Sequence, residues 1–276
     1  MKIAVLSGKG GTGKTTVSAS LASALNKCQY IDCDVEEPNG AIFMKPQIAG
    51  SEDVTVMTPV IDEALCVGCG ACAKACRFHA LALAGKKVLV FSELCHSCGA
   101  CMIACRQNAI SESSRSIGVV ASDAEGLFLQ GRLNVGESIA VPIIRKLKQM
   151  LRCDIPVVLD SPPGASCTVV NTIEDCDYCL LVTEPTPFGL HDLQIAVQLV
   201  RSMGIDFGVV INKAAENDST IHEHCTANNI PVLMEIPFSK SIAERYSRGL
   251  LPVHNDRVWQ MKFMNLYEQI ARRCRK

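Results

Sequence analysis

The densest group of chemically capable residues is a set of cysteines. Eight of the sixteen cysteines lie between Cys66 and Cys105, in two copies of the spacing C-x2-C-x2-C-x3-C. At this spacing three close thiolates of one copy hold an iron–sulfur cluster together with the fourth thiolate of the other copy. Zinc sites usually show separated pairs of ligands instead. The sequence therefore predicts two [4Fe–4S] clusters, the first on Cys66, Cys69, Cys72 and Cys105, and the second on Cys95, Cys98, Cys101 and Cys76.

The two copies resemble bacterial two-cluster ferredoxins. They start 29 residues apart, at Cys66 and Cys95, and Lys86–Phe91 between them is predicted to be a strand of a small hairpin. Ferredoxins usually have proline after the fourth cysteine, whereas this chain has Arg77 and Arg106. A guanidinium beside a cluster would favour its reduced state and raise its potential, and a solvated arginine would leave it unchanged.

A second group of residues can bind phosphate. The segment Ser7–Thr16 follows an apolar run, Ile3–Leu6, and leads into a helix expected to end near Lys27. A glycine-rich turn at a helix N-terminus presents successive backbone N–H groups to phosphates. This arrangement is the P-loop, in which a lysine contacts the outer phosphates and the next hydroxyl binds Mg²⁺. The residues expected to contact the nucleotide here are Gly8, Gly10, Gly11, Thr12, Gly13, Lys14, Thr15 and Thr16.

Carboxylates follow two expected strands. Gln29–Ile31 leads into Asp32-Cys33-Asp34, and the apolar run Ile155–Leu159 leads into Asp160. The carboxyl ends of parallel strands meet at one edge of a sheet, so acids there can hold Mg²⁺ and the attacking water beside a P-loop. An isolated Asp-x-Asp would be read as a simple turn, so this interpretation depends on the P-loop.

A second lysine precedes the P-loop lysine by five residues. The segment Lys9–Thr16 reads Lys-Gly-Gly-Thr-Gly-Lys-Thr-Thr and resembles the deviant Walker A motif of the Min/ParA/nitrogenase-iron-protein branch of P-loop ATPases. The resemblance implies that Lys9 reaches across a dimer interface to the partner's nucleotide. A solvated surface lysine is the alternative. The partner would be a second copy of this chain or a similar ATPase, in a homodimer or a heterodimer.

The same resemblance assigns roles to the acidic residues. Asp32 and Asp160 would hold Mg²⁺ together with the Thr15 hydroxyl, and Asp34 would activate the attacking water. Asp160 opens the segment Asp-Ser-Pro-Pro-Gly, which is similar to the second switch of the family. The amide of Gly164 would sense the γ-phosphate there.

The base is predicted to be adenine. The expected strand 207–211 leads into Asn212-Lys213, and a guanine-reading loop would continue as Asn-Lys-x-Asp. Position 215 is alanine. ATP is therefore the expected nucleotide, with Asn212 on the adenine, as in this ATPase branch, and Pro237 beside the base.

Three cysteines outside the repeats have weaker signals. Cys167 lies seven residues after Asp160, the offset at which the nitrogenase iron protein holds a cluster shared across its dimer. Cys167 is thus a candidate to hold metal at a dimer interface, or else a small buried residue. Cys176 and Cys179 have a C-x-x-C spacing but enter an apolar strand, so core packing is predicted.

Composition and order predict the architecture. The chain is 48% hydrophobic with a net charge of −1, which implies no nucleic-acid partner. It has no apolar run long enough to span a bilayer, and it begins on the P-loop strand, so a cytoplasmic protein without a signal peptide is expected. An apolar stripe near the C-terminus is expected to pack on the sheet, not to bind a membrane surface. Residues 127–135 are expected to form a hairpin, and residues 139–151 a helix.

The fold class that follows is α/β, a doubly wound, mostly parallel sheet with an inserted α+β ferredoxin module. The expected domains are a first ATPase part at 1–61, the insert at 62–114, and a second ATPase part at 115–276. The leading hypothesis is a Mg²⁺-dependent ATPase that couples hydrolysis to iron–sulfur electron transfer toward a partner metalloprotein or a metal cluster under assembly. The alternatives are a cluster scaffold or carrier, and a positioning ATPase of the partition type with structural or sensing clusters.

Overall fold

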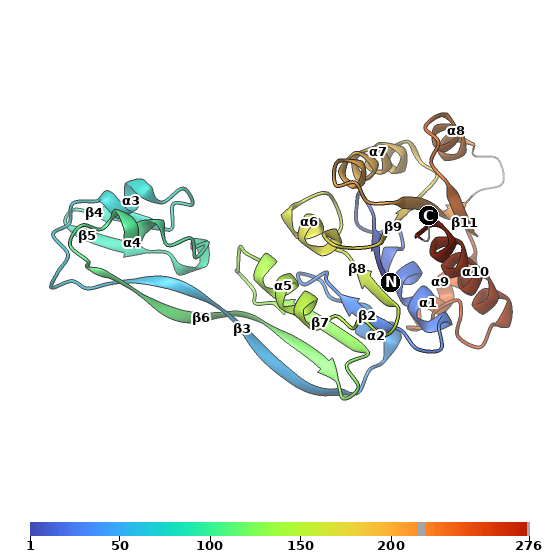
Figure 1. Ribbon diagram of the computed structural model, residues 1–276, viewed down its shortest axis with the longest axis horizontal. Helices are drawn as coiled ribbons and strands as arrows, with labels where there is room; N and C mark the ends of the chain where they lie inside the picture. Colours follow the sequence, from blue (N-terminus) through green and yellow to red (C-terminus); the bar gives the residue numbers. More distant parts are fainter. Residues whose placement is uncertain (215–218, 275–276) are drawn as a thin grey trace.

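The computed structural model describes residues 1–214 and 219–274. Ala215, used above to predict the base, lies outside the described residues, as do Arg275 and Lys276. The molecule has a large α/β body and a small unit at the far end of a long two-stranded ribbon (Figure 1). Within the described residues, no helix is long and apolar enough to cross a membrane.

The body is built on one nine-stranded sheet with the order β11-β10-β9-β1-β8-β2-β7-β6-β3. The seven strands from β11 to β7 run parallel, and β6 and β3 are antiparallel additions at one edge. The parallel strands are β1 (Lys2–Leu6), β2 (Gln29–Asp32), β7 (Phe128–Leu133), β8 (Val157–Asp160), β9 (Tyr178–Thr183), β10 (Phe207–Ala214) and β11 (Val232–Pro237). The predicted doubly wound, mostly parallel sheet is confirmed.

Helices cover both faces of this sheet, because its central strands carry apolar side chains on both faces and each face must be shielded from water. One face packs against α5 (Val141–Gln149), α6 (Cys167–Ile173), α7 (Pro187–Ser202) and α8 (Thr220–Ala227). The other packs against α1 (Lys14–Ala24), α2 (Gly40–Met44) and α10 (Arg257–Cys274), with α9 (Lys240–Ser247) beside them. The apolar stripe of α10 is buried in this second core, as predicted.

One expected element is wrong. Residues 127–135 do not form a hairpin, because Phe128–Leu133 is the single strand β7. This strand pairs with β2 on one side and with β6 on the other. A hairpin within the segment would leave β2 without its neighbour on that side. The β7 strand thereby joins the sheet that carries Asp32 to the ribbon.

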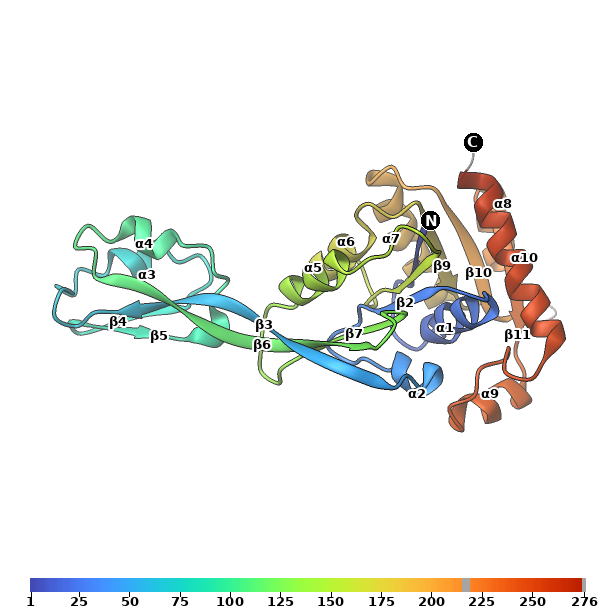
Figure 2. The ribbon, with the colours of Figure 1, turned by 60° about the horizontal axis from the view of Figure 1, so that its bottom comes forward.

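The ribbon consists of β3 (Ile48–Ile61) and β6 (Ile110–Asp123), which pair antiparallel over most of their length. Residues 62–109 form the small unit at its tip (Figure 2). The unit contains α3 (Ala71–Ala75), the hairpin of β4 (Leu81–Ala84) and β5 (Lys87–Val90), a short 3-10 turn at Ser92–Leu94, and α4 (Ala100–Ala104). Residues 110–114, placed in the insert from the sequence, belong to β6.

The sequence repeat in this unit is also a repeat of backbone conformation. Three pairs of residues at the 29-residue offset are left-handed in both copies: Gly68 and Ser97, Gly70 and Gly99, and His79 and Asn108. Gly70 and Gly99 directly precede α3 and α4. At Gly68 a Cβ atom would also lie 2.5 Å from the Lys86 carbonyl oxygen. The two copies therefore fold the same way and face each other through α3 and α4.

Candidate nucleotide site and two cysteine-lined cavities

The P-loop opens onto a cavity of about 470 Å³ at the carboxyl ends of the strands. Two left-handed glycines, Gly11 and Gly13, turn the chain from β1 into α1. The other walls are the loop after β2 and the segment from β11 into α9, including Tyr246. The predicted residues that line the cavity are Lys9, Gly10, Gly11, Gly13, Lys14, Thr15, Thr16, Asp34, Asn212 and Pro237. The cavity thus combines P-loop amides with an apolar wall suited to a base.

Two residues predicted to contact the nucleotide, Gly8 and Thr12, do not line the cavity. At Gly8 a Cβ atom would lie 2.4 Å from the carbonyl oxygen of Asp192 in α7, so this glycine is required for close packing. Thr12 is buried, and its hydroxyl has no hydrogen-bond partner among the described residues. Both residues shape the loop from behind the cavity.

Lys14 is held by carboxylates at the floor of the cavity. Its Nζ lies 2.9 Å from Asp160 Oδ1 and 3.7 Å from Asp34 Oδ2. Burial alone would lower the pKa of Lys14, but Asp160 and Asp34 outweigh it and raise that pKa above its ordinary value. Lys14 is therefore charged, and a nucleotide phosphate would compete with these carboxylates for it.

Asp32 is fully buried behind Lys14 and holds the loop after β2. Its Oδ1 accepts the Asp34 amide at 3.1 Å, and its Oδ2 accepts the amides of Asn39 and Gly40 at 3.0 and 2.8 Å. Burial and the charge of Asp160 raise the pKa of Asp32 to about 7. Burial raises the pKa of Asp34 to about 6. Asp32 therefore positions Asp34 in addition to its predicted role toward Mg²⁺.

Tyr30 is a member of the site that sequence reasoning missed. Its hydroxyl donates to Asp160 Oδ2 at 3.0 Å, and its ring stacks on Phe128. A Cβ atom at Gly40 would lie 2.6 Å from the Tyr30 ring, so the loop after β2 also rests on it. The sequence did contain a signal for Tyr30: it lies two residues before Asp32 in a strand expected to be buried, and a buried tyrosine hydroxyl needs a hydrogen-bond partner.

The remaining predicted residues brace the loops. The Gly164 amide donates to the Ser7 carbonyl at 2.9 Å, so it must be released before it can contact a phosphate. Asn212 Nδ2 donates to the Thr12 carbonyl at 2.7 Å. Lys213, also missed, bridges the Gly11 carbonyl and Glu184 at 3.1 and 2.7 Å. These contacts tie the second switch and β10 to the P-loop.

Asp32 makes the stability of the nucleotide-free protein depend on pH. A carboxyl group whose pKa rises from 3.8 to about 7 on folding binds its proton more tightly in the native state. The free energy of unfolding should therefore fall as pH rises from about 4 to about 7, by on the order of 4 kcal/mol from this group. Asp32→Asn should remove that part of the slope in urea denaturation, whatever its effect at one pH. An unchanged slope would contradict the assignment.

The eight repeat cysteines line two separate cavities in the small unit. The groups are Cys66, Cys69, Cys72 and Cys105 in the first cavity, and Cys76, Cys95, Cys98 and Cys101 in the second. Each group combines three cysteines of one copy with the fourth of the other. Backbone amides donate to two of the sulfurs, from Ser97 to Cys95 and from Ala109 to Cys105. Arg77 and Arg106 are exposed.

The four thiols of each cavity match the number of protein ligands that a [4Fe–4S] cluster requires. Among the described residues, no three His, Cys, Asp or Glu side chains are close enough to hold one metal ion. Each cavity is lined by four thiols beside apolar residues, such as Ile61 and Val88 in the first. This donor set fits a cubane with one thiolate on each iron.

Three of the cysteines outside the repeats, Cys33, Cys176 and Cys179, are packed into the body. Cys33 and Cys179 are buried in the sheet, and burial raises the pKa of both thiols and that of Cys176, the latter to about 12. The predicted core packing of Cys176 and Cys179 agrees with this environment. Cys167 is exposed at the start of α6.

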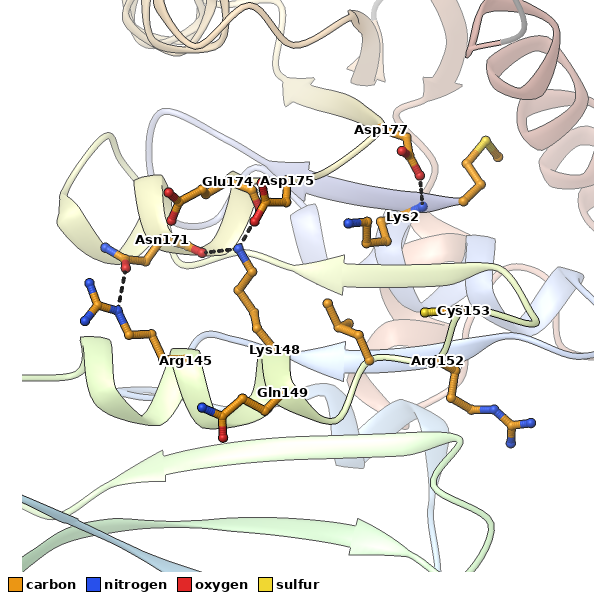
Figure 3. A pocket seen from close by; sticks show the side chains of 12 residues that line it. Lys2, Arg145, Lys148, Gln149, Arg152, Cys153, Asn171, Glu174, Asp175 and Asp177 are labelled. Atoms are coloured by element: carbon orange, nitrogen blue, oxygen red, sulfur yellow. Dashed lines mark hydrogen bonds between the residues drawn. The ribbon is translucent and has the colours of Figure 1, made fainter.

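A larger cavity, about 640 Å³, lies at the amino ends of β1, β8 and β9, away from the P-loop (Figure 3). Two of its cations are engaged: Lys148 donates to the carbonyls of Asn171 and Glu174, and Arg145 contacts the Asn171 side chain. The Lys2 backbone amide donates to Asp177 at 2.6 Å. No predicted site residue lies in this cavity, and we assign it no ligand.

Comparison with known proteins agrees with this geometry. The model of the CobQ/CobB/MinD/ParA nucleotide binding domain matches residues 3–253. An uncharacterized protein of Methanocaldococcus jannaschii, MJ0579, is 32% identical over 261 residues, covering 90% of each chain. The iron-sulfur cluster carrier protein of Pyrococcus abyssi is 25% identical, covering 85% of this chain and 67% of its own. MinD of Pyrococcus horikoshii, solved with Mg-ADP, superposes with a TM-score of 0.59 at 17% identity, covering 98% of this chain and 95% of its own.

The chain belongs to the CobQ/CobB/MinD/ParA family of nucleotide-binding proteins. Its likeness to solved MinD structures is a likeness of fold.

Proposed function

We propose that this protein is a Mg²⁺-dependent ATPase that carries two [4Fe–4S] clusters in its inserted unit, and that its nucleotide state governs electron transfer to a partner metalloprotein or to a metal cluster under assembly. The observation that carries the proposal is the grouping of the eight repeat cysteines into two cavities, each drawn from both copies. Four thiols per cavity in this pairing are the ligand set of a two-cluster ferredoxin.

The nucleotide side of the proposal depends on Lys14. Its ammonium is paired with Asp160 and Asp34, and a bound ATP would draw it toward the phosphates. Asp160 and Thr15 would then be available to Mg²⁺, and Asp34 to the attacking water. Lys9 lines the same cavity and is available to a second subunit. MinD of P. horikoshii binds Mg-ADP on the same fold, which supports this use of the cavity.

The cysteine side depends on access to solvent. When bound, each cluster would accept and release one electron. In the first group Cys72 is buried and Cys69 exposed, and in the second Cys95 is buried and Cys98 exposed. Each cavity therefore has one thiol at the surface, where a partner protein could approach, and one buried thiol.

The test is an anaerobic titration of purified protein. Both clusters are followed by EPR while Mg-ATP, Mg-ADP or a non-hydrolysable analogue is added. We expect two [4Fe–4S] clusters whose potential or re-oxidation rate changes with the nucleotide, by about tenfold in the rate or equilibrium measured. ATP with excess EDTA is the control and should produce no change. Clusters that ignore every nucleotide would contradict the proposed coupling.

A cluster carrier is the second candidate function. It is favoured by relatives that are named iron-sulfur cluster carrier proteins. The exposed Cys69 and Cys98 would be the points of exchange with an apo-acceptor. Stoichiometric loss of iron and sulfide to an apo-ferredoxin, stimulated by Mg-ATP, would favour this function over electron transfer.

A further inference from the structure

The loop that carries Cys95 is tied to the ATPase body by an arginine of the ribbon. Arg115 in β6 donates through Nη1 to the Glu137 carboxylate and through Nη2 to the Ser92 carbonyl, the latter at 2.9 Å. The Ser92 carbonyl also accepts the Cys95 amide at 3.1 Å. Ser138 adds a parallel link from its hydroxyl to the Glu93 carbonyl at 2.6 Å. A single guanidinium therefore joins the loop after β7 to the turn that places Cys95.

This contact is better suited to fixing an arrangement than to adding stability. Glu137 and Arg115 are only 8% and 19% exposed, so the pair is largely desolvated. Arg115 Nε and Glu137 Oε2 have no hydrogen-bond partner among the described residues. A buried ion pair with unsatisfied atoms contributes little net stability but disfavours other geometries.

The other end of the same loop rests on the first switch. The Leu133 amide, at the end of β7, donates to the Val35 carbonyl at 2.7 Å, and Val35 directly follows Asp34. Val35 is buried, and a Cβ atom at Gly131 would lie only 2.6 Å from its Cγ1. Because the two backbones are packed this closely, Val35 cannot move without moving the end of β7.

The two groups of cysteines differ in their links to the body. Ribbon residues line both cavities, Ile61 and Ile110 the first, and Met57 and Glu112 the second. The second group also has a hydrogen bond to the ribbon, from the Ser97 hydroxyl to the Met57 carbonyl at 2.6 Å. For the loop Cys66–Cys76 of the first group, the described part of the chain provides hydrogen bonds only within the small unit. A displacement of the loop after β7 would thus reach Cys95 first.

We propose that Arg115 and Glu137 are positioning residues that transmit the nucleotide state from Asp34–Val35 to the Cys95 loop, so that the second cluster responds to ATP more strongly than the first. This inference rests on the proposed function and deepens it. The element proposed to shift is the loop between β7 and α5, residues 134–140. Leu133 connects it to Val35 at one end, and Arg115 connects its Glu137 to Ser92 at the other. Such a route is established only when a change at Asp34–Val35 and a change at the Cys95 loop are both measured and shown to depend on each other.

The test uses the full, cluster-loaded chain under anaerobic conditions. Arg115→Lys keeps the charge but loses the planar fork whose two separate nitrogens reach Glu137 and Ser92. Glu137→Gln keeps the shape but loses the charge. Arg132→Lys, on the exposed face of the neighbouring β7, is the matched control. Two quantities are compared between Mg-ATP and Mg-ADP: hydrogen exchange at residues 92–98, and the redox midpoint of each cluster by EPR. Iron content and thermal melting establish that every variant is folded.

In the wild type and in Arg132→Lys, we expect exchange at residues 92–98 to differ about tenfold between the nucleotides, and the midpoint of the second cluster to shift more than that of the first. Arg115→Lys and Glu137→Gln should each reduce the exchange difference to about twofold or less and remove the larger shift, with iron content unchanged. Full retention of both in the two variants would overturn this route and leave the proposed function standing. Equal response of both clusters in the wild type would also overturn it. Absence of any nucleotide effect in the wild type would overturn the proposed coupling itself.

Discussion

Lys14→Ala should abolish ATP hydrolysis, reducing the rate by at least about a thousandfold. The ammonium of Lys14 is the cation at the floor of the cavity, within 2.9 Å of Asp160 and 3.7 Å of Asp34. Without it, charge developing on the phosphates would have no positive side chain of this subunit at the floor of the site, and the two carboxylates would repel the nucleotide. Phosphate release with Mg-ATP is the measurement.

The same variant should lose stability, by about 3 kcal/mol, because removing one partner of a buried ion pair leaves an uncompensated charge. Asp160 is fully buried, and within residues 1–214 and 219–274 it would retain only the Tyr30 hydroxyl as a side-chain partner. Lys240→Ala in α9 is the control, since that lysine is 90% exposed. It should alter neither the hydrolysis rate nor urea denaturation. Hydrolysis by Lys14→Ala within about tenfold of the wild-type rate would show that Lys14 does not act on the phosphates.

Removal of iron should unfold the inserted unit while the body stays folded. The buried core of residues 62–109 and the adjoining ribbon consists of Cys72, Leu81, Val88 and Ile110, and one of these is itself a predicted cluster ligand. A unit of this size cannot bury enough apolar surface to fold alone and normally depends on metal or disulfides. Cluster binding should therefore supply most of its folding free energy.

Hydrogen exchange before and after chelation measures this effect. Protection of β4, β5 and α3 should disappear with the iron, whereas β1 and β8 should keep theirs. Cys98→Ser should bind about half of the wild-type iron, because it removes a ligand of one cluster only. Cys153→Ser, which changes an exposed cysteine of the body, should bind all of it. A unit that stays protected after complete loss of iron would exclude a structural dependence on the clusters.

Within the nucleotide site, the P-loop was predictable from sequence, whereas most contacts around Asp160 were not. Residues 7–16 form the P-loop from consecutive positions, so their order alone specifies a turn between strand and helix. The residues around Asp160 come from distant segments, and their mutual contacts have no sequence spacing. Sequence reasoning accordingly missed Tyr30 and Lys213. It also missed that the Gly164 amide is bonded to the Ser7 carbonyl and must leave it to reach a phosphate. The hairpin expected at 127–135 failed for a related reason, because local turn signals cannot report that β2 needs a neighbour.

What the sequence by itself determined are the features encoded within one short stretch: the phosphate-binding turn, the repeated cysteine spacing and the buried parallel strands. Their physical basis is local, in backbone conformation and in periodic hydrophobicity. Only the tertiary structure decided that β3 and β6 hold the cysteines on a long ribbon, and that Arg115 meets both Glu137 and Ser92. These contacts join residues far apart in the chain, so they exist only once the sheet has brought its strands together.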